Sequence, residues 1–135
     1  MRSMICIANR AIPDWPPLAW LARCRSDQET VDVCHGPRVE TSRDWFAEAV
    51  WAGRYSDGDF DRTDLVFGSG ARLRDGALTF VSPGSTVDRL QFFRGPDATW
   101  VSNSLPCLLA ATRAVPDPTF TGYFAFFESI IRGVC

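Results

Sequence analysis

The sequence lacks the features that would point to a membrane or to nucleic acid. No apolar run approaches the roughly 20 residues that a bilayer-spanning helix needs. The 14 basic residues are scattered singly among 16 acidic ones, the formal net charge is -2, and no basic run or Arg-rich helix face occurs. The first apolar stretch, Met4–Ala8, is too short for the core of a signal peptide. We therefore expect a cytoplasmic protein that binds neither a membrane nor nucleic acid.

Signatures of metal sites and disulfides are also missing. The five cysteines are irregularly spaced, and none lies in the two-residue gap of a zinc or redox motif. We expect free thiols, with Cys6 and Cys107 buried in apolar surroundings. The single histidine, His35, follows Cys34 directly. Neighbours on a strand point to opposite faces, so the two form no proton-transfer pair, and we expect His35 in a solvent-exposed turn.

Two loop motifs resemble ligand-binding sequences only in part. Asp57, Asp59 and Asp61 alternate as at the start of a calcium loop, with Asp64 nearby. However, Arg62 stands where that loop needs Gly, and the closing Glu is missing, so we expect a solvated acidic turn. The segment 68–70 (Gly-Ser-Gly) lacks the Lys of a P-loop and the third Gly of a dinucleotide motif, so it is predicted to be a turn.

The chain is long enough, at 135 residues with 46% hydrophobic residues, to bury the core of one domain. A strand is expected at Met4–Ala8, stopped by Asn9 and the prolines that follow, and a second at Thr30–Cys34. Pro16 and Pro17 are predicted to begin a short helix reaching Leu21. Further expected elements are a helix capped by Thr41 or Ser42, with Trp45, Phe46, Ala49 and Val50 on one face and Gly53 at its end.

The second half of the chain is rich in strand signals. Asp75-Gly76 predicts a two-residue hairpin turn within Arg72–Val81. A further strand is expected at Leu65–Phe67, and a strand pair at Leu90–Arg94 and Thr99–Ser102. A helix follows, capped by Ser102, Asn103 or Ser104, with Pro106 in its first turn and with Leu105, Leu108, Leu109 and Thr112 facing inward. A final apolar helix is expected between Phe120 and Ile131.

Residues 58–133 carry a family resemblance in four stretches. These stretches are Gly58-Asp59-Phe60, Asp88–Phe93, Trp100–Ala110 and Asp117–Gly133. The first three resemble the N-terminal glutamine amidotransferase domain of asparagine synthetases and of related enzymes, including lasso-peptide cyclases. The fourth resembles the linker helix that leads from this domain into the synthetase half. The resemblance implies an α+β fold: a shortened αββα sandwich of mainly antiparallel sheets with flanking helices. Residues 1–115 would be the degenerate amidotransferase-like domain, and 116–135 a linker helix towards a synthetase domain.

The catalytic chemistry of that family does not transfer to this sequence. Its glutaminases attack with a Cys directly after the initiator Met, and the α-amine of that Cys is the base. Here Arg2 holds that position, and Cys6 lies inside the chain without a free amine or a following Gly. Residues 94–97 match part of the family's arginine motif literally but lie in the wrong place along the chain, and we expect a turn there. Cys6 would become a nucleophile only after proteolytic processing.

We therefore expect a non-catalytic structural and interaction domain of an asparagine-synthetase-like, ATP-dependent, amide-forming ligase. Its expected partner is a synthetase domain, in the same chain or on another subunit, which alone would bind ATP and Mg²⁺. This chain itself would need no cofactor or metal, and oligomerisation stays open. The expected contact residues are Trp15, Trp20, Phe126 and Phe127. The alternatives are a glutaminase activated by processing to Cys6 and a stand-alone small binding protein.

Overall fold

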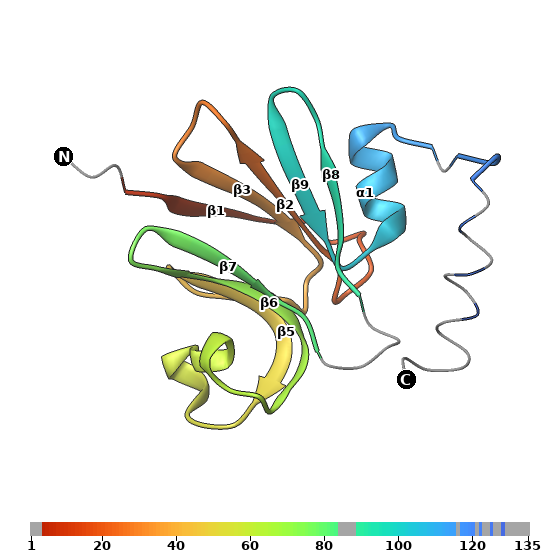
Figure 1. Cartoon of the computed structure of the whole chain (residues 1–135). Helices are drawn as coiled ribbons and strands as arrows, with labels where there is room; N and C mark the ends of the chain where they lie inside the picture. Colours follow the sequence, from red (N-terminus) through yellow and green to blue (C-terminus); the bar gives the residue numbers. More distant parts are fainter. Residues whose placement is uncertain are drawn as a thin grey trace.

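The chain forms an α+β fold of two mainly antiparallel sheets, as the resemblance implied (Figure 1). The computed structural model describes residues 4–83, 89–115 and 117–120, with residues 122, 125 and 128. In chain order, the elements of these residues are β1 (Cys6–Ala11), β2 (Trp20–Arg25), β3 (Thr30–His35), β4 (Glu40–Thr41), β5 (Trp45–Trp51), η1 (Tyr55–Asp57), η2 (Asp59–Arg62), β6 (Val66–Arg74), β7 (Ala77–Val81), β8 (Gln91–Arg94), β9 (Ala98–Ser102) and α1 (Leu105–Thr112).

The first sheet, sheet A, has the strand order β1-β3-β2-β9-β8. Its only parallel pair within the described residues is β1 with β3, whereas β3 with β2, β2 with β9 and β9 with β8 are antiparallel. The predicted strand pair at β8 and β9 is confirmed. The turn between them, predicted at residues 94–97, is closed by the N–H of Gly95, which donates to the carbonyl of Ala98 at 2.9 Å.

The second sheet, sheet B, has the order β4-β5-β6-β7 and is antiparallel throughout. The predicted Asp75-Gly76 hairpin is confirmed, because β6 and β7 pair from Arg74 and Ala77 outward. Asp75 has φ 50° and Gly76 has φ 77°. These positive values at both central residues are what a two-residue turn between twisted strands requires.

Three sequence-based predictions of local structure are wrong. The segment 45–51, predicted as a helix, is strand β5, and the segment 68–70, predicted as a turn, lies inside β6. The predicted short helix that reaches Leu21 is also absent, because β2 starts at Trp20 and pairs with both β3 and β9. In each case, pairing with strands distant in the sequence overrides the local helix or turn signal.

The main core lies between the two sheets. Trp20 of β2 is its centre, with 0% of its surface exposed. The Trp20 ring packs edge-to-face on Phe46 at 4.9 Å between centroids and stacks on Phe80 at 6.0 Å. The other buried members of this cluster are Ala22, Val31, Val33, Val39, Ala71 and Val101.

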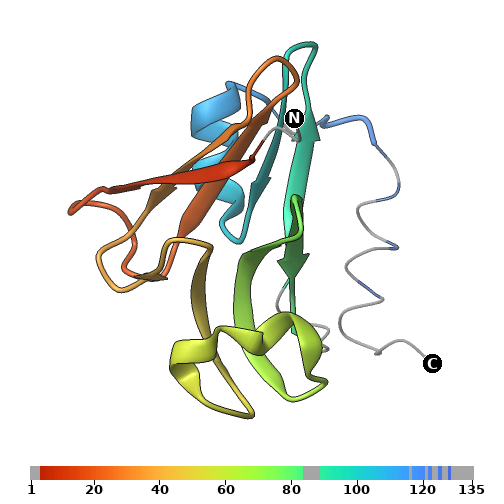
Figure 2. The ribbon, with the colours of Figure 1, turned by 90° about the vertical axis from the view of Figure 1, so that its left-hand side faces the viewer.

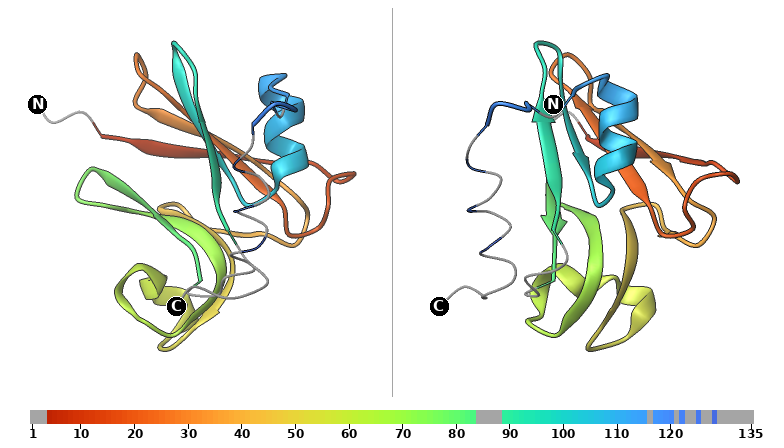
Figure 3. Two further views of the ribbon diagram at one scale, coloured as in Figure 1. Left: turned by 45° about the vertical axis from the view of Figure 1, so that its right-hand side comes forward. Right: turned by 90° about the vertical axis from the view of Figure 1, so that its right-hand side faces the viewer.

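Helix α1 packs on sheet A, on the face turned away from sheet B (Figures 2 and 3). The predicted cap is confirmed at Ser104, whose side-chain oxygen accepts a hydrogen bond from the N–H of Cys107 at 3.4 Å. Pro106 stands in the first turn, where its missing N–H costs no helical hydrogen bond. Leu108 is buried against the sheet, as expected, but Leu105 is exposed.

The outer face of sheet B is covered by the two 3-10 helices (Figure 1, yellow-green). They pack an aromatic cluster against β5, in which Trp45 and Phe60 are buried and the Trp51 and Tyr55 rings stack at 4.5 Å. This short aromatic layer occupies the place where the expected sandwich would have a flanking helix. No helix among the described residues is long and apolar enough to cross a membrane. Most of the predicted linker helix at 116–135 lies outside the described residues.

Candidate functional site

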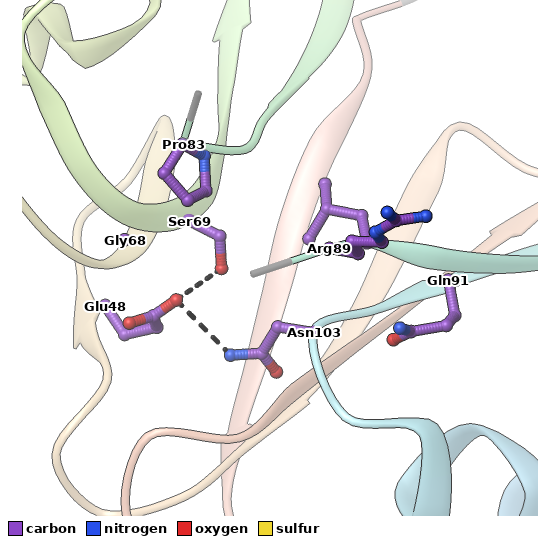
Figure 4. A pocket seen from close by; sticks show the side chains of 8 residues that line it. Glu48, Gly68, Ser69, Pro83, Arg89, Gln91 and Asn103 are labelled. Carbon is purple, nitrogen blue, oxygen red and sulfur yellow. Dashed lines mark hydrogen bonds between the residues drawn. The ribbon is translucent and has the colours of Figure 1, made fainter. Parts of the chain in front are cut away.

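A small polar pocket opens where the middle of β5 and β6 meets the loop after β9 (Figure 4). Its volume is about 270 Å³. The pocket is lined by Glu48, Gly68, Ser69, Pro83, Arg89, Leu90, Gln91 and Asn103. Because its walls come from both sheets, the pocket exists only in the folded chain.

Glu48 and Ser69 form the floor of this pocket from adjacent strands. They are directly opposite each other on β5 and β6. Strand alternation places both on the face that also carries Phe46, which points into the main core. The inner face of sheet B therefore changes from apolar to polar within two residues.

A chain of side-chain hydrogen bonds fixes the orientation of the Glu48 carboxylate. The indole Nε1 of Trp20 donates to Ser69 Oγ at 3.0 Å, and Ser69 Oγ donates in turn to Glu48 Oε1. The Nδ2 group of Asn103 lies 3.4 Å from the same carboxylate oxygen (Figure 4).

Asn103 is itself anchored to the backbone on both sides of its amide. Its Nδ2 donates to the carbonyl of Leu18 at 2.8 Å, and its Oδ1 accepts from the N–H of Trp20 at 2.8 Å. The preceding Ser102 is buried, and its hydroxyl donates to the carbonyl of Trp20. The loop after β9 is thus tied to the start of β2, and the pocket wall is rigid.

The structure places Cys6, the candidate nucleophile, away from this pocket. Ile5 and Ile7 pack against the main core, so Cys6 on β1 points to the opposite face, where its thiol lies 3.5 Å from Thr30 Oγ1. The prediction that Cys6 is buried is wrong, because β1 is an edge strand and leaves the thiol exposed. Cys107, also predicted to be buried, is half-buried.

His35 cannot serve Cys6 as a base. Cys6 is in register with Thr30, and His35 lies five residues further along the same strand, roughly 16 Å away. The prediction of an exposed turn histidine is also wrong, since His35 ends β3 with only 7% of its surface exposed. Its Nδ1 lies 2.8 Å from the carbonyl oxygen of Gly36. Burial raises the pKa of the neighbouring Cys34 thiol, which makes it less reactive.

The acidic segment binds an arginine of the chain itself. Arg74 on β6 donates to Asp61 at 2.8 Å and also pairs with Asp59. The prediction of a fully solvated turn is therefore wrong for Asp61, whose side chain is only 8% exposed. The described residues contain no group of three or more His, Cys, Asp or Glu side chains placed to hold a metal ion.

The structure treats the predicted partner-contact residues separately. The prediction that Trp20 contacts a partner is wrong, because Trp20 is fully enclosed between the sheets. Trp15 is half-buried in the loop before β2 and keeps some accessible surface. Phe126 and Phe127 lie outside the described residues.

Sequence reasoning missed Glu48, Ser69 and Asn103. The available signal for Glu48 was a single acidic residue inside the apolar segment 45–51. The sequence predicts a turn at Ser69 and a possible helix cap at Asn103. None of these signals shows that the three side chains converge, because they come from separate strands and a loop.

Comparison of the chain with protein-family models, with curated proteins and with solved structures gives no match.

Proposed function

We propose that this chain is a non-catalytic structural and interaction domain of an asparagine-synthetase-like, ATP-dependent, amide-forming ligase. The observation that carries this proposal is exposed apolar surface on the inner faces of the sheets. Val50 and Phe67 are directly opposite on β5 and β6, and they are 62% and 70% exposed. Phe92 on β8 is 67% exposed. Exposed apolar side chains of this size favour burial against a partner.

Strand alternation places these side chains around the polar pocket. Val50 shares the face of Glu48 on β5, and Phe67 shares the face of Ser69 on β6. Phe92 follows Leu90, which packs against the main core, on the inner face of sheet A. The exposed surface is therefore the continuation of the inter-sheet core beyond the point where the two sheets cover each other.

The arrangement of nucleophilic groups supports a role without catalysis. Cys6 has a peptide bond where the family's nucleophile has its free amine, and its thiol lies 3.5 Å from the neutral hydroxyl of Thr30. The proposed partner is a synthetase domain, in the same chain or on another subunit, which supplies the ATP and Mg²⁺ chemistry. The proposed location is the cytoplasm, and self-association is compatible with the same surface.

The first test is the intact mass and N-terminal sequence of the protein purified from its native host. We expect a species that starts at Met1 and carries a synthetase domain or copurifies with a synthetase subunit. A monomeric 15.0 kDa protein that binds no synthetase overturns the proposal.

The second test maps the contact surface in that assembly. Replacing Val50 and Phe67 by Ser removes two neighbouring apolar side chains from the proposed interface and should weaken association with the synthetase domain about tenfold or more. Met4→Ser is the matched control, because Met4 is also exposed and apolar but lies at the start of the chain, before β1. Equal association of all three proteins contradicts this assignment of the surface.

One observation favours the alternative of a glutaminase activated by processing. Cys6 is exposed and borders a hollow of about 1050 Å³ between the start of β1 and the tip of the β6–β7 hairpin. That alternative requires a mature terminus at Cys6 and ammonia release from glutamine that Cys6→Ala abolishes. An intact Met1 terminus in the native protein excludes it.

A further inference from the structure

We propose that the pocket formed by β5, β6 and the loop after β9 binds a small primary ammonium compound, with Glu48 as its anionic anchor. This site goes beyond the interaction role proposed above and does not depend on it. Three features of the pocket support this assignment: the hydrogen-bond partners of Glu48, the fixed geometry of the pocket floor, and the volume and lining of the space above it.

The Glu48 carboxylate borders the pocket without an ion pair to any described residue. Glu48 is half-buried. Two neutral donors, Ser69 and Asn103, form hydrogen bonds with it. An ammonium group of a ligand would give this carboxylate charge-assisted hydrogen bonds, which are roughly twice as strong as those between neutral groups.

The carboxylate is also held ready for such a ligand. Ser69 is fixed by the indole of the fully buried Trp20, and Asn103 is fixed by backbone groups on both sides of its amide. Binding therefore costs little side-chain entropy on the protein side. A flexible surface glutamate would lose part of its interaction energy to ordering.

Gln91 supplies a second acceptor on the lining of the pocket. Its Oε1 is buried and accepts no hydrogen bond within the described part of the chain. An unsatisfied buried carbonyl is unfavourable, and a rotation of the Gln91 amide would let it accept from a ligand N–H. A primary ammonium has three N–H donors, enough for both Glu48 and Gln91, whereas a quaternary ammonium has none.

The size and the apolar part of the lining limit the ligand to a short aliphatic amine. The volume of about 270 Å³ lies below the roughly 300–1,000 Å³ of pockets for drug-sized ligands. Pro83 and Leu90 offer apolar contact for a short alkyl chain. In Figure 4 the guanidinium of Arg89 lies on the side of the pocket away from the Glu48 carboxylate, so a compact cation at Glu48 keeps its distance from it.

The test is a titration of the full chain with n-butylammonium chloride, followed by two-dimensional ¹H–¹⁵N NMR at constant chloride concentration. We expect saturable shifts of the backbone amides of Glu48, Ser69 and Asn103, with a dissociation constant on the order of millimolar. The matched probe is n-butyltrimethylammonium chloride, which has the same tail and charge but no N–H donor. It should bind about tenfold more weakly or not at all.

Glu48→Gln should weaken binding of n-butylammonium about tenfold or more, because it removes the charge and retains the shape. Glu40→Gln, on the exposed β4 strand, is the control and should leave binding unchanged. If the Glu48→Gln protein does not fold, the proposal is still tested by comparing the binding of the two ammonium probes to the unaltered chain. Absence of saturable shifts, equal binding of both probes, or unchanged binding by a folded Glu48→Gln protein overturns the proposal.

Discussion

Arg74 shows how one side chain organises the acidic segment between β5 and β6. Its guanidinium donates to Asp61 at 2.8 and 3.1 Å and also reaches Asp59. Burial alone would raise the pKa of Asp61, but the hydrogen bonds and charge of Arg74 outweigh it and hold that pKa below its ordinary value of 3.8. The same pairing raises the pKa of Arg74.

This pairing predicts a specific pH dependence of stability. A carboxyl whose pKa is lower in the folded chain stabilises the fold fully above pH 3.8, and this contribution is lost as the pH falls below that value. Asp61→Asn should therefore lower the free energy of unfolding by about 1.5 kcal/mol near pH 7 and flatten its decline in acid. Urea unfolding at pH 7, 5, 4 and 3 measures both effects. Asp64→Asn, at an exposed carboxyl, should keep the decline of the unaltered chain.

Strand β5 shows why an element can be mistaken from sequence. Trp45 and Ala49, and likewise Phe46 and Val50, are spaced as on one face of a helix. The same residues also alternate correctly for a strand that is buried on both sides, with Trp45 and Ala47 in the aromatic cluster and Phe46 in the main core. Periodicity alone does not distinguish a helix from a strand in this segment. The segment is a strand because it pairs with β6. The β6–β7 hairpin and the cap of α1 were predictable because both depend on adjacent residues only.

Glycines in β6 allow the close approach of β5. A Cβ at Gly70 would lie 2.3 Å from the carbonyl oxygen of Phe46. Gly70→Ala should therefore force the two strands apart and destabilise the fold by about 2 kcal/mol. Gly95→Ala is the matched control, since its Cβ would meet nothing closer than 3.4 Å. Thermal or urea unfolding of both variants checks this, and equal stability would contradict the assigned contact.

At the scale of the whole molecule, a buried polar link joins the two sheets within an otherwise apolar core. The indole N–H of Trp20 in sheet A donates to Ser69 Oγ in sheet B at 3.0 Å, and the Ser69 hydroxyl in turn donates to the Glu48 carboxylate. Hydrophobic contacts have no preferred direction, whereas a hydrogen bond between the sheets requires one relative orientation of the two sheets. It therefore fixes how sheet A sits on sheet B.

Removing this link should destabilise the whole domain cooperatively. Ser69→Ala leaves the buried N–H of Trp20 without its acceptor and should cost about 1–3 kcal/mol in the free energy of unfolding. Thr79→Ala, an exposed change on β7, should stay within about 0.5 kcal/mol of the unaltered chain. Urea unfolding followed by tryptophan fluorescence reports on the inter-sheet core directly. A Ser69→Ala protein as stable as the Thr79→Ala control would show that packing alone joins the sheets.

The sequence by itself determined the features that depend on neighbouring residues: the Asp75-Gly76 turn, the Ser104 cap and the strand pair at β8 and β9. The α+β class followed from the family resemblance of residues 58–133. The tertiary structure alone decided that Trp45–Trp51 is a strand, that His35 is buried and Cys6 exposed, and that Glu48, Ser69 and Asn103 share one pocket. The physical reason is the range of the forces involved. Turns and caps are settled by hydrogen bonds within a few residues, whereas strand pairing and burial depend on partners up to 83 residues away, as between Trp20 and Asn103.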